Sequence, residues 1–327
     1  MVRFGILGPG QIARRFASDI QLVSNAELVA VASRSLEKAE KFKEEFGAQI
    51  AYDSYEKLAQ SDLIDAVYIA TPHNFHLEQA KLMIRNGKHV LIEKPITVNS
   101  RGLEEVLYLA KKYKVLVMEA FWTRFLPSTN RVKEIIEKKD LGKLNQVEFN
   151  FGIELPVDYP EIGRMLNPKL AGGSILDLGI YPVSTTRFFD QSDIVSMDVD
   201  AHLSELGVDL DMSCTIEFSS GLIAHLRSSF SQELDMNGLL EFENGYIIMK
   251  DFFHSQQLIV NGQKVDIPFR GHGFVDEIES FTNTVLSGQL ENEVMTYKVM
   301  RDVMQLLDTI RSKAKVYYEF EKRESDD

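Results

Sequence analysis

Small residues near the start of the chain have the spacing of a phosphate-binding turn. The segment Gly8-Pro9-Gly10-Gln11-Ile12-Ala13 fits the pattern G-x-G-x-x-G/A. Gly8 would make the tight turn, Gly10 would leave room for a pyrophosphate, and Ala13 would let a helix pack closely on its strand. Gln11 and Ile12 open that helix, whose free N–H groups favour negative charge. The pattern predicts a dinucleotide site; the alternative is a glycine turn that merely joins a strand to a helix.

The second predicted strand ends in Ser33-Arg34-Ser35, and Lys38 follows. Sites that bind NAD usually carry Asp or Glu here, about 20 residues beyond the glycine turn, to hold the ribose hydroxyls. A carboxylate would repel the 2′-phosphate of NADP, whereas Arg34 can clamp it and a serine hydroxyl can donate to it. Glu37, the nearest acid, falls inside the following helix. We expect NADP, with NAD as the alternative; Arg34 could otherwise be a solvated loop arginine.

Two further polar segments follow predicted strands, at Thr71–His76 and at Glu93-Lys94-Pro95. Ligands of open parallel sheets bind beyond the carboxyl ends of the strands, so both segments would face the cofactor. Lys94, held by a proline, would be a fixed cation above the nicotinamide; the alternative is an ordinary loop lysine. His73 and His76 lie at a spacing that can suit a metal on a helix. No Cys or acid accompanies them at ligand spacing, so we expect no metal site.

The elements that must position these residues alternate between strand and helix, which predicts a parallel sheet with crossover helices. Asp53 or Ser54 is expected to cap a short helix, and Ser100 a later one. The strands that we predict are Val2–Leu7, Leu28–Ala32, Ala66–Ala70, His89–Ile92 and Val115–Met118, and the main helices are Gln11–Asp19, a Lys/Glu-rich helix ending near Gly47, and Phe75–Asn86.

Beyond Met118 the pattern becomes richer in β structure. Turns at Ser220-Gly221, Asn244-Gly245 and Asn261-Gly262 predict hairpins, the two Asn-Gly pairs as type I′ turns, within an antiparallel meander over residues 194–269. We therefore expect an α/β Rossmann domain over residues 1–121 and an α+β domain with an open, mostly antiparallel sheet over 122–327. Its predicted elements are Asn130–Lys139, Val147–Ile153, Ile194–Ala201, Met212–Phe218, Leu222–Phe230, Val275–Leu286 and Tyr297–Ala314.

Composition narrows the function classes. The 327 residues are 44% hydrophobic and carry a net charge of −13, which argues against nucleic-acid and anionic-membrane partners. No apolar run approaches the roughly 18 residues that span a bilayer, and no signal peptide is expected at the N-terminus. The single cysteine, Cys214, cannot form an intrachain disulfide, which fits a cytoplasmic protein.

Taken together, the segments GPGQIA, TPHNFH, EKP, EAFWTRFLP and GGSILDLGIYP resemble the Gfo/Idh/MocA family of oxidoreductases. Within that family, residues 119–125 and Tyr181 resemble the branch of the dimeric dihydrodiol dehydrogenases, anhydrofructose reductases and NADP-linked xylose dehydrogenases. The resemblance implies a Rossmann domain followed by an open sheet. It also implies a homodimer or higher homo-oligomer formed through the free face of that sheet.

The resemblance assigns roles position by position. Lys94 would contact the nicotinamide ribose and the substrate oxygen, Glu93 would hold the ribose, and Pro95 would be a cis proline. Asp177 and Tyr181 match a motif in which many relatives carry Asp-x-x-x-His, so tyrosine replaces histidine here. The resemblance also places a loop at the cofactor cleft, formed by Thr71, Pro72, Asn74 and His76.

Tyr181 suits proton exchange with a substrate oxygen. Hydride transfer to a carbonyl needs an acid at that oxygen, and the reverse reaction needs a base. Free tyrosine titrates near pKa 10, so neutral Tyr181 serves better as the acid, although a nearby Lys94 cation would lower its pKa. Asp177, four residues earlier, would share its face in a helix and could orient a hydroxyl. The alternatives are a carboxylate at a helix N-terminus for Asp177 and a core tyrosine for Tyr181.

Trp122 and Arg124 follow the last Rossmann strand, where an indole could stack on a sugar ring and a guanidinium could bind a hydroxyl or carboxylate; Trp122 is equally suited to a core. We thus expect an NADP(H)-dependent oxidoreductase that transfers a hydride between nicotinamide and a small molecule, namely a sugar, polyol, diol or related carbonyl compound. The NADP preference and Tyr181 both favour reduction. Two alternatives remain open: a sugar oxidoreductase that retains its cofactor, and a non-enzymatic NADP sensor.

Overall fold

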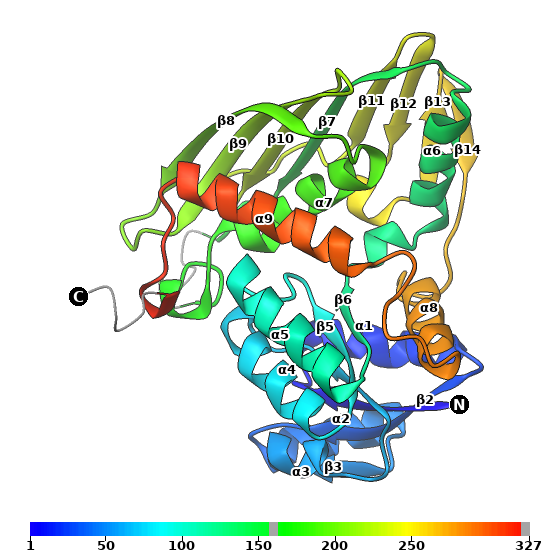
Figure 1. Cartoon of the computed structure of the whole chain (residues 1–327), viewed down its shortest axis with the longest axis vertical. Helices are drawn as coiled ribbons and strands as arrows, with labels where there is room; N and C mark the ends of the chain where they lie inside the picture. Colours follow the sequence, from blue (N-terminus) through cyan, green and yellow to red (C-terminus); the bar gives the residue numbers. More distant parts are fainter. Residues whose placement is uncertain (157–162, 322–327) are drawn as a thin grey trace. The chain divides into compact units, whose positions relative to one another are not determined.

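The computed structural model describes residues 1–156 and 163–321, and its contacts divide the chain into two compact units (Figure 1). The first unit comprises residues 1–122 and 270–301, and the second comprises residues 123–269 and 302–327. The chain therefore leaves the first unit after residue 122, returns to it at residue 270, and leaves it again after residue 301. The domain limits expected from the sequence, 1–121 and 122–327, do not include a segment that returns to the first domain. These limits stay a prediction.

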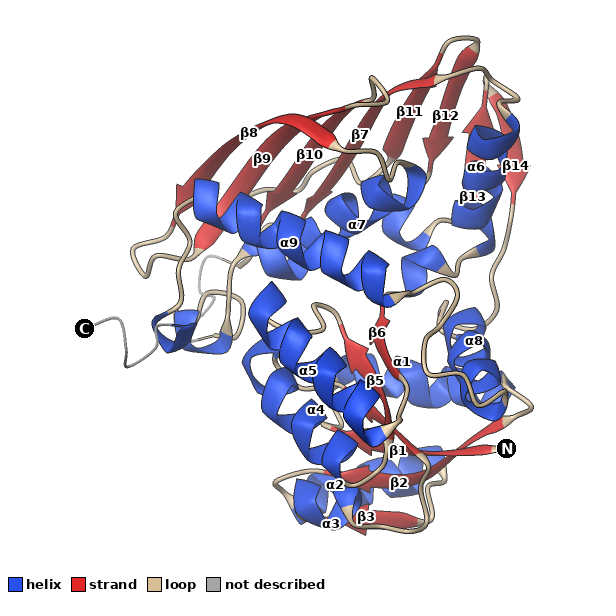
Figure 2. Cartoon of the chain, viewed as in Figure 1, coloured by secondary structure: helices blue, strands red, loops and turns tan. Residues whose placement is uncertain are grey.

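The first unit contains a six-stranded parallel sheet in the order β3-β2-β1-β4-β5-β6 (Figure 2). This order is that of the doubly wound dinucleotide-binding fold, so the predicted Rossmann sheet is confirmed. Its strands are β1 (Val2–Leu7), β2 (Ala26–Ala32), β3 (Ile50–Tyr52), β4 (Ala66–Ile69), β5 (His89–Glu93) and β6 (Val117–Ala120), and its crossover helices are α1 (Gln11–Asp19), α2 (Leu36–Phe46), α3 (Tyr55–Ala59), α4 (His76–Arg85) and α5 (Ser100–Tyr113).

Local chemistry decides where these elements begin and end. Ser54 caps α3 by accepting a bond from the Lys57 amide, so the Ser54 alternative is the right one. The predicted cap at Ser100 is wrong. Asn99 has extended dihedral angles and accepts from the Gly102 amide at 2.9 Å, which makes Ser100 the first helical residue. The last strand begins at Val117 and not at Val115, because Lys114 ends α5 in the left-handed conformation and the chain still has to turn.

A buried carboxylate anchors the segment that returns to the first unit. Asp19, at the end of α1, is 1% exposed and accepts the amide of His272 at 2.8 and 2.9 Å and that of Phe274 at 2.9 Å. Gly271 has φ +58, and a Cβ atom there would lie 2.3 Å from Asp19 Oδ1. The carboxylate thus fixes the turn from which helix α8 (Val275–Leu286) starts. Phe281 of α8 then packs against Phe4 of β1, with ring centroids 5.6 Å apart.

The second unit contains an eight-stranded sheet in the order β14-β13-β12-β11-β7-β10-β9-β8. The prediction of a continuous antiparallel meander over residues 194–269 is wrong. Strand β7 lies between β10 and β11 and runs parallel to β10. The connection after β10 therefore crosses the end of β7. Gly152 makes this crossing possible, since a Cβ atom there would lie 2.5 Å from the Leu234 side chain. The strands are β7 (Leu144–Gly152), β8 (Ile194–Leu203), β9 (Asp209–Phe218), β10 (Ile223–Ser229), β11 (Gly238–Phe242), β12 (Gly245–Met249), β13 (Gln257–Val260) and β14 (Gln263–Asp266).

The two Asn-Gly turns differ. Asn261 and Gly262 both have positive φ, 48° and 81°, as the predicted type I′ turn requires. At the other pair only Gly245 has positive φ, and it is already paired with Phe242 in the ladder, so the type I′ prediction is wrong there. The ladder explains the difference, because pairing of Phe242 with Gly245 leaves Glu243 and Asn244 as the turn residues, and neither has positive φ. The Asn261 side chain accepts the Tyr246 amide and occupies the space where a Gly245 Cβ atom would stand.

Helices cover one face of this sheet. Helices α6 (Pro127–Lys138) and α7 (Ile180–Phe189) lie on that face (Figure 2). Along β9 the side chains of Met212, Cys214, Ile216 and Phe218 are buried, whereas of the residues between them Ser213 and Glu217 are exposed and Thr215 is half-buried. This period of two shows which face forms the core. Helix α9 (Tyr297–Lys313) completes the fold, and no helix in the described part of the chain is long and apolar enough to cross a bilayer.

We predict that Asp19→Ala lowers the free energy of unfolding by about 3 kcal/mol, because it leaves the amides of His272 and Phe274 buried without an acceptor. Urea unfolding followed by circular dichroism measures the change. Asp62→Ala, on an exposed site, is the control and should stay within about 0.5 kcal/mol of the wild type. A loss below about 1 kcal/mol for Asp19→Ala would mean that other contacts hold the returning segment.

Candidate active site

The glycine turn has the geometry that a pyrophosphate needs. Gly8 follows β1 with φ +93, and Gly10, at the N-terminus of α1, has no atom within 4 Å of the position of a Cβ. No side chain caps α1. The first amides of the helix, from Gln11 and Ile12, are therefore not capped by a side chain and can bind an anion. Ala13 is fully buried, as close packing of α1 requires. These residues fit a dinucleotide.

The end of β2 carries side chains that can donate hydrogen bonds to a phosphate. Arg34 is exposed, and its guanidinium acts on the Tyr55 hydroxyl: burial raises the pKa of Tyr55, and the charge and hydrogen bond of Arg34 oppose that shift. The Ser33 hydroxyl accepts the Ser35 amide, and the Ser35 hydroxyl caps α2 by accepting the Lys38 amide. As acceptors in these bonds, both hydroxyls keep their own hydrogen for donation. Glu37 pairs with Lys41 along α2, at 2.7 Å, and does not stand at the strand end.

The loops after β4 and β5 are joined by one buried histidine. His76 Nε2 lies 2.8 Å from the Thr71 carbonyl oxygen, and Nδ1 lies 2.9 Å from that of Pro95. Burial lowers the pKa of His76, so the neutral ring donates to one of the two oxygens. The bridge holds together the two segments that sequence predicts at the cofactor, Thr71–His76 and Glu93–Pro95. Within them, Pro72 and Asn74 lie beside the bridge in the chain, and the Lys94–Pro95 bond is cis, as expected.

Buried carboxylates lie beneath these loops. Glu93 accepts a bond from the Tyr68 hydroxyl, and Glu119 accepts the Ile96 amide at 2.9 Å. Glu277 of α8 is fully buried, and burial, followed by the charges of Glu93 and Glu119, raises its pKa well above the ordinary range. Burial therefore disfavours the charged form of Glu277 beside the carboxyl groups of Glu93 and Glu119. The sequence contains a signal for it, because Glu277 stands four residues before Phe281 on the apolar face of α8.

The second unit holds Asp177 and Tyr181 on one continuous helical segment. Asp177 lies in a π-helix, Ile175–Gly179, and Tyr181 lies in the first turn of α7. The segment is therefore helical, as the expectation from their four-residue spacing required. Single π-helical turns are frequent at functional sites. Asp177 Oδ2 accepts a bond from Arg164 at 2.9 Å, which opposes any role as a free base. Sequence analysis missed Arg164, because the partners are joined only by the fold.

Tyr181 is 8% exposed and lies among aromatic rings. Its ring centroid is 5.2 Å from that of Phe151 on β7 and 5.7 Å from that of Phe253, and these two phenylalanines stack on each other at 4.3 Å. The rings fix the direction of the tyrosine. They come from separate parts of the sequence, 151 and 253, and no local pattern links them to residue 181.

The two residues predicted to touch substrate are both buried. Trp122 is 7% exposed and packs edge-on against Phe274, with centroids 4.6 Å apart. Arg124 is 1% exposed and donates to the hydroxyl and carbonyl oxygens of Ser184, with its guanidinium 5.1 Å from the Phe188 ring. Such contacts are those of packing residues, and the substrate roles stay predictions. Across residues 1–156 and 163–321, no group of three His, Cys, Asp or Glu side chains could hold a metal.

Known proteins share this architecture. The family model "Oxidoreductase family, NAD-binding Rossmann fold" matches residues 2–121, and the "GFO/IDH/MocA C-terminal domain" model matches residues 129–248. The crystal structure of KijD10, a 3-ketoreductase from Actinomadura kijaniata in complex with NADP and TDP-benzene, superposes with a TM-score of 0.85 at 25% identity. The match covers 95% of this chain and 97% of that one.

Two relatives extend the comparison. Trans-1,2-dihydrobenzene-1,2-diol dehydrogenase of Xenopus tropicalis is 33% identical over 230 residues, which are 69% of this chain and 68% of the relative. D-xylose 1-dehydrogenase (NADP(+)) 2 of Haloferax volcanii is 36% identical over 227 residues, 69% of each protein. With a Rossmann sheet, an uncapped glycine turn and these relatives, the chain belongs to the GFO/IDH/MocA family of NAD(P)-dependent oxidoreductases.

Proposed function

We propose that this oxidoreductase prefers NADP(H) and acts on a sugar, polyol, vicinal diol or related carbonyl compound. The observation that carries the cofactor preference is the exposed Arg34 at the end of β2, with Ser33 and Ser35 beside it and Glu37 paired elsewhere. The names of two similar proteins support it, since one is an NADP(+)-linked xylose dehydrogenase and the other is a ketoreductase crystallised with NADP. The single cysteine, Cys214, suits a reducing, cytoplasmic setting.

Three residues have separate roles in the proposed reaction. A nicotinamide cofactor held by the glycine turn and the end of β2 would supply or accept the hydride. Lys94, at the end of β5, polarises the substrate oxygen, and Tyr181 donates a proton to that oxygen in reduction or removes one in oxidation. The neutral phenol needs no activation as an acid, so the arrangement favours reduction. Asp177, held by Arg164, orients a substrate hydroxyl.

We predict that Arg34→Ala weakens NADPH binding about 10- to 100-fold and leaves NADH binding unchanged, because only the 2′-phosphate loses a charged partner. Titration calorimetry with both cofactors measures the change. Arg85→Ala, at an exposed site at the end of α4, is the matched control and should bind both cofactors like the wild type. An unchanged preference in Arg34→Ala would remove this residue from the phosphate site.

We predict that Lys94→Ala and Tyr181→Phe each lower kcat/KM by about 100-fold or more, because each removes a group that acts on the reacting oxygen. The assay is a panel of aldoses, polyols, osones and diols followed by NADPH absorbance. The matched controls are Lys111→Ala and Tyr108→Phe, both exposed on α5. If both variants turn over the best substrate at the wild-type rate, the assignment is wrong. Cofactor that survives gel filtration would instead favour an oxidoreductase that retains it.

We also propose that a second copy of this chain covers the helix-free face of the eight-stranded sheet. Apolar side chains stand exposed on several of its strands, among them Val195 at 66%, Tyr246 at 38% and Ile223 at 37%. Light scattering after size exclusion should give twice the 37.2 kDa chain mass or a higher multiple. Tyr246→Lys together with Ile223→Lys should shift the mass towards one chain; an unchanged assembly would place the interface elsewhere.

A further inference from the structure

The backbone just before the Asp177 helix is held from several sides. The Gly172 carbonyl accepts a bond from the Tyr318 hydroxyl at 2.7 Å, and the Gly173 amide donates to the Met165 carbonyl at 2.8 Å. The Ile175 amide, in the first turn of the π-helix, donates to Asp209 Oδ2 at 2.6 Å. These contacts fix where the helical segment starts.

Asp209 is the charged member of this set. It starts β9, is fully buried, and its Oδ2 also accepts the Ser174 hydroxyl at 2.8 Å. The Ser174 hydroxyl in turn lies 2.8 Å from the Ser228 hydroxyl of β10. Residues of two strands, β9 and β10, therefore hold the start of the helix through one chain of hydrogen bonds. Asp209 Oδ1 faces Gly173, whose φ is +122 and where a Cβ atom would lie only 2.2 Å away. The other residue types would clash with the carboxylate.

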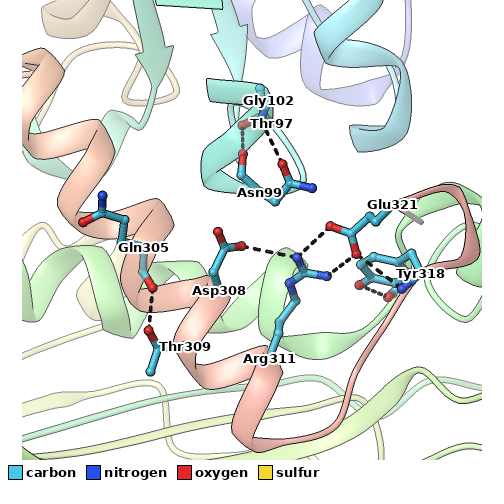
Figure 3. Close-up of polar contacts among 10 residues, drawn as sticks. Thr97, Asn99, Gly102, Gln305, Asp308, Thr309, Arg311, Tyr318 and Glu321 are labelled. Atoms are coloured by element: carbon cyan, nitrogen blue, oxygen red, sulfur yellow. Dashed lines mark hydrogen bonds and ion pairs between the residues drawn. The ribbon is translucent and has the colours of Figure 1, made fainter. Parts of the chain in front are cut away.

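Few charges act on Asp209. The charge of Arg311 of α9 acts on Asp209, but its guanidinium is already bound by Glu321 at 2.9 and 3.0 Å and by Asp308 at 3.3 Å (Figure 3). Tyr318 is a titratable neighbour, and burial, followed by the charge of Asp209, raises its pKa. Ser174, just before the π-helix, and Ser228 of β10 are the other groups of the hydrogen-bond chain, and neither titrates. Burial therefore dominates and raises the pKa of Asp209 from 3.8 to about 6, against the hydrogen bonds that its carboxylate accepts.

This raised pKa has a definite sign for stability. Protonation is easier in the folded chain than in the unfolded one, so the stabilising contribution is present below the unfolded pKa and is lost as pH rises through about 6. At neutral pH the ionised carboxylate therefore makes the fold less stable than a neutral acceptor of the same shape would. Asparagine could accept both bonds without the charge. Groups that oppose stability in this way are frequent where function requires them.

We propose that Asp209 is a positioning residue whose negative charge holds the start of the Asp177–Tyr181 helical segment in its active arrangement. A charged acceptor binds the Ile175 amide and the Ser174 hydroxyl more strongly than a neutral one does. The segment then carries Asp177 and Tyr181 on a fixed backbone. The activity consequence rests on the proposed function of those two residues, whereas the backbone consequence does not.

The first test compares Asp209→Asn with the wild type across pH. Above pH 7 we expect kcat/KM to fall about tenfold while NADPH affinity stays unchanged and the melting temperature stays equal or rises. At pH 5, where Asp209 is neutral, the two proteins should converge in kcat/KM. Opposite changes in activity and stability separate positioning from a merely structural role. Equal kcat/KM at pH 8, or a parallel loss of activity and stability, would overturn the proposal.

A second variant guards against misfolding of the first. Ser174→Ala keeps the charge but removes one bond that lowers the pKa of Asp209, so the acid limb of kcat/KM should move to higher pH. The matched control is Asp211→Asn on the same strand, whose bonds go to the hydroxyls of Ser229 and Ser231. It should change neither the limb nor the helical segment. An unmoved acid limb in Ser174→Ala would contradict the role of Asp209.

Hydrogen exchange gives a readout that does not need turnover. At pH 8 the amides of residues 173–181 should exchange several-fold faster in Asp209→Asn than in the wild type, with no difference for Asp211→Asn, and the ratio should approach one at pH 5. Unchanged exchange at pH 8 would refute the positioning role, whatever the activity. Faster exchange in a protein that turns over no substrate would instead refute the proposed function and leave the positioning role standing.

Discussion

Asp19 accepts the amides of His272 and Phe274, and this interaction joins the two ends of the first unit in sequence. A buried carboxylate needs donors, and the turn at Gly271 brings two of them to it. The turn sets the start of α8, and α8 brings Phe281 to β1 and Glu277 to the ends of β5 and β6. The strand ends that carry Glu93 and Lys94 therefore depend on a contact at the opposite end of α1 from the glycine turn.

The second unit also contains a buried carboxylate that accepts hydrogen bonds, but its effect on stability differs. Asp209 binds a hydroxyl and one amide and stays without a direct ion pair to Arg311, which Glu321 and Asp308 already engage. In the first unit the carboxylate stabilises a turn, whereas here the charge opposes stability at neutral pH and acts on a helix start. The two cases show that burial alone does not say whether an acid serves folding or function. The role of the acid depends on the donors that bind it and on the residues that those donors position.

The cofactor site could be predicted because its chemistry is local in sequence. Gly8 to Ala13 joins strand, turn and helix within one short segment, and the strand order then follows from the alternation of elements. The cap at Asn99 was missed because its neighbour Ser100 has the same capping chemistry, and only the backbone angles distinguish them. The insertion of β7 and the pairing of Arg164 with Asp177 depend on long-range pairing, which neither periodicity nor spacing encodes.

The return of residues 270–301 to the first unit has a consequence for how the chain folds during synthesis. A ribosome releases the Rossmann strands first, yet Asp19 and Phe4 must wait for partners that emerge some 250 residues later. Domains usually fold as units in order of synthesis. Here the first unit can complete its core only after the whole eight-stranded sheet has been made, and the second unit in turn takes up residues from 302 onwards, so neither unit is complete before residue 301 has been synthesised.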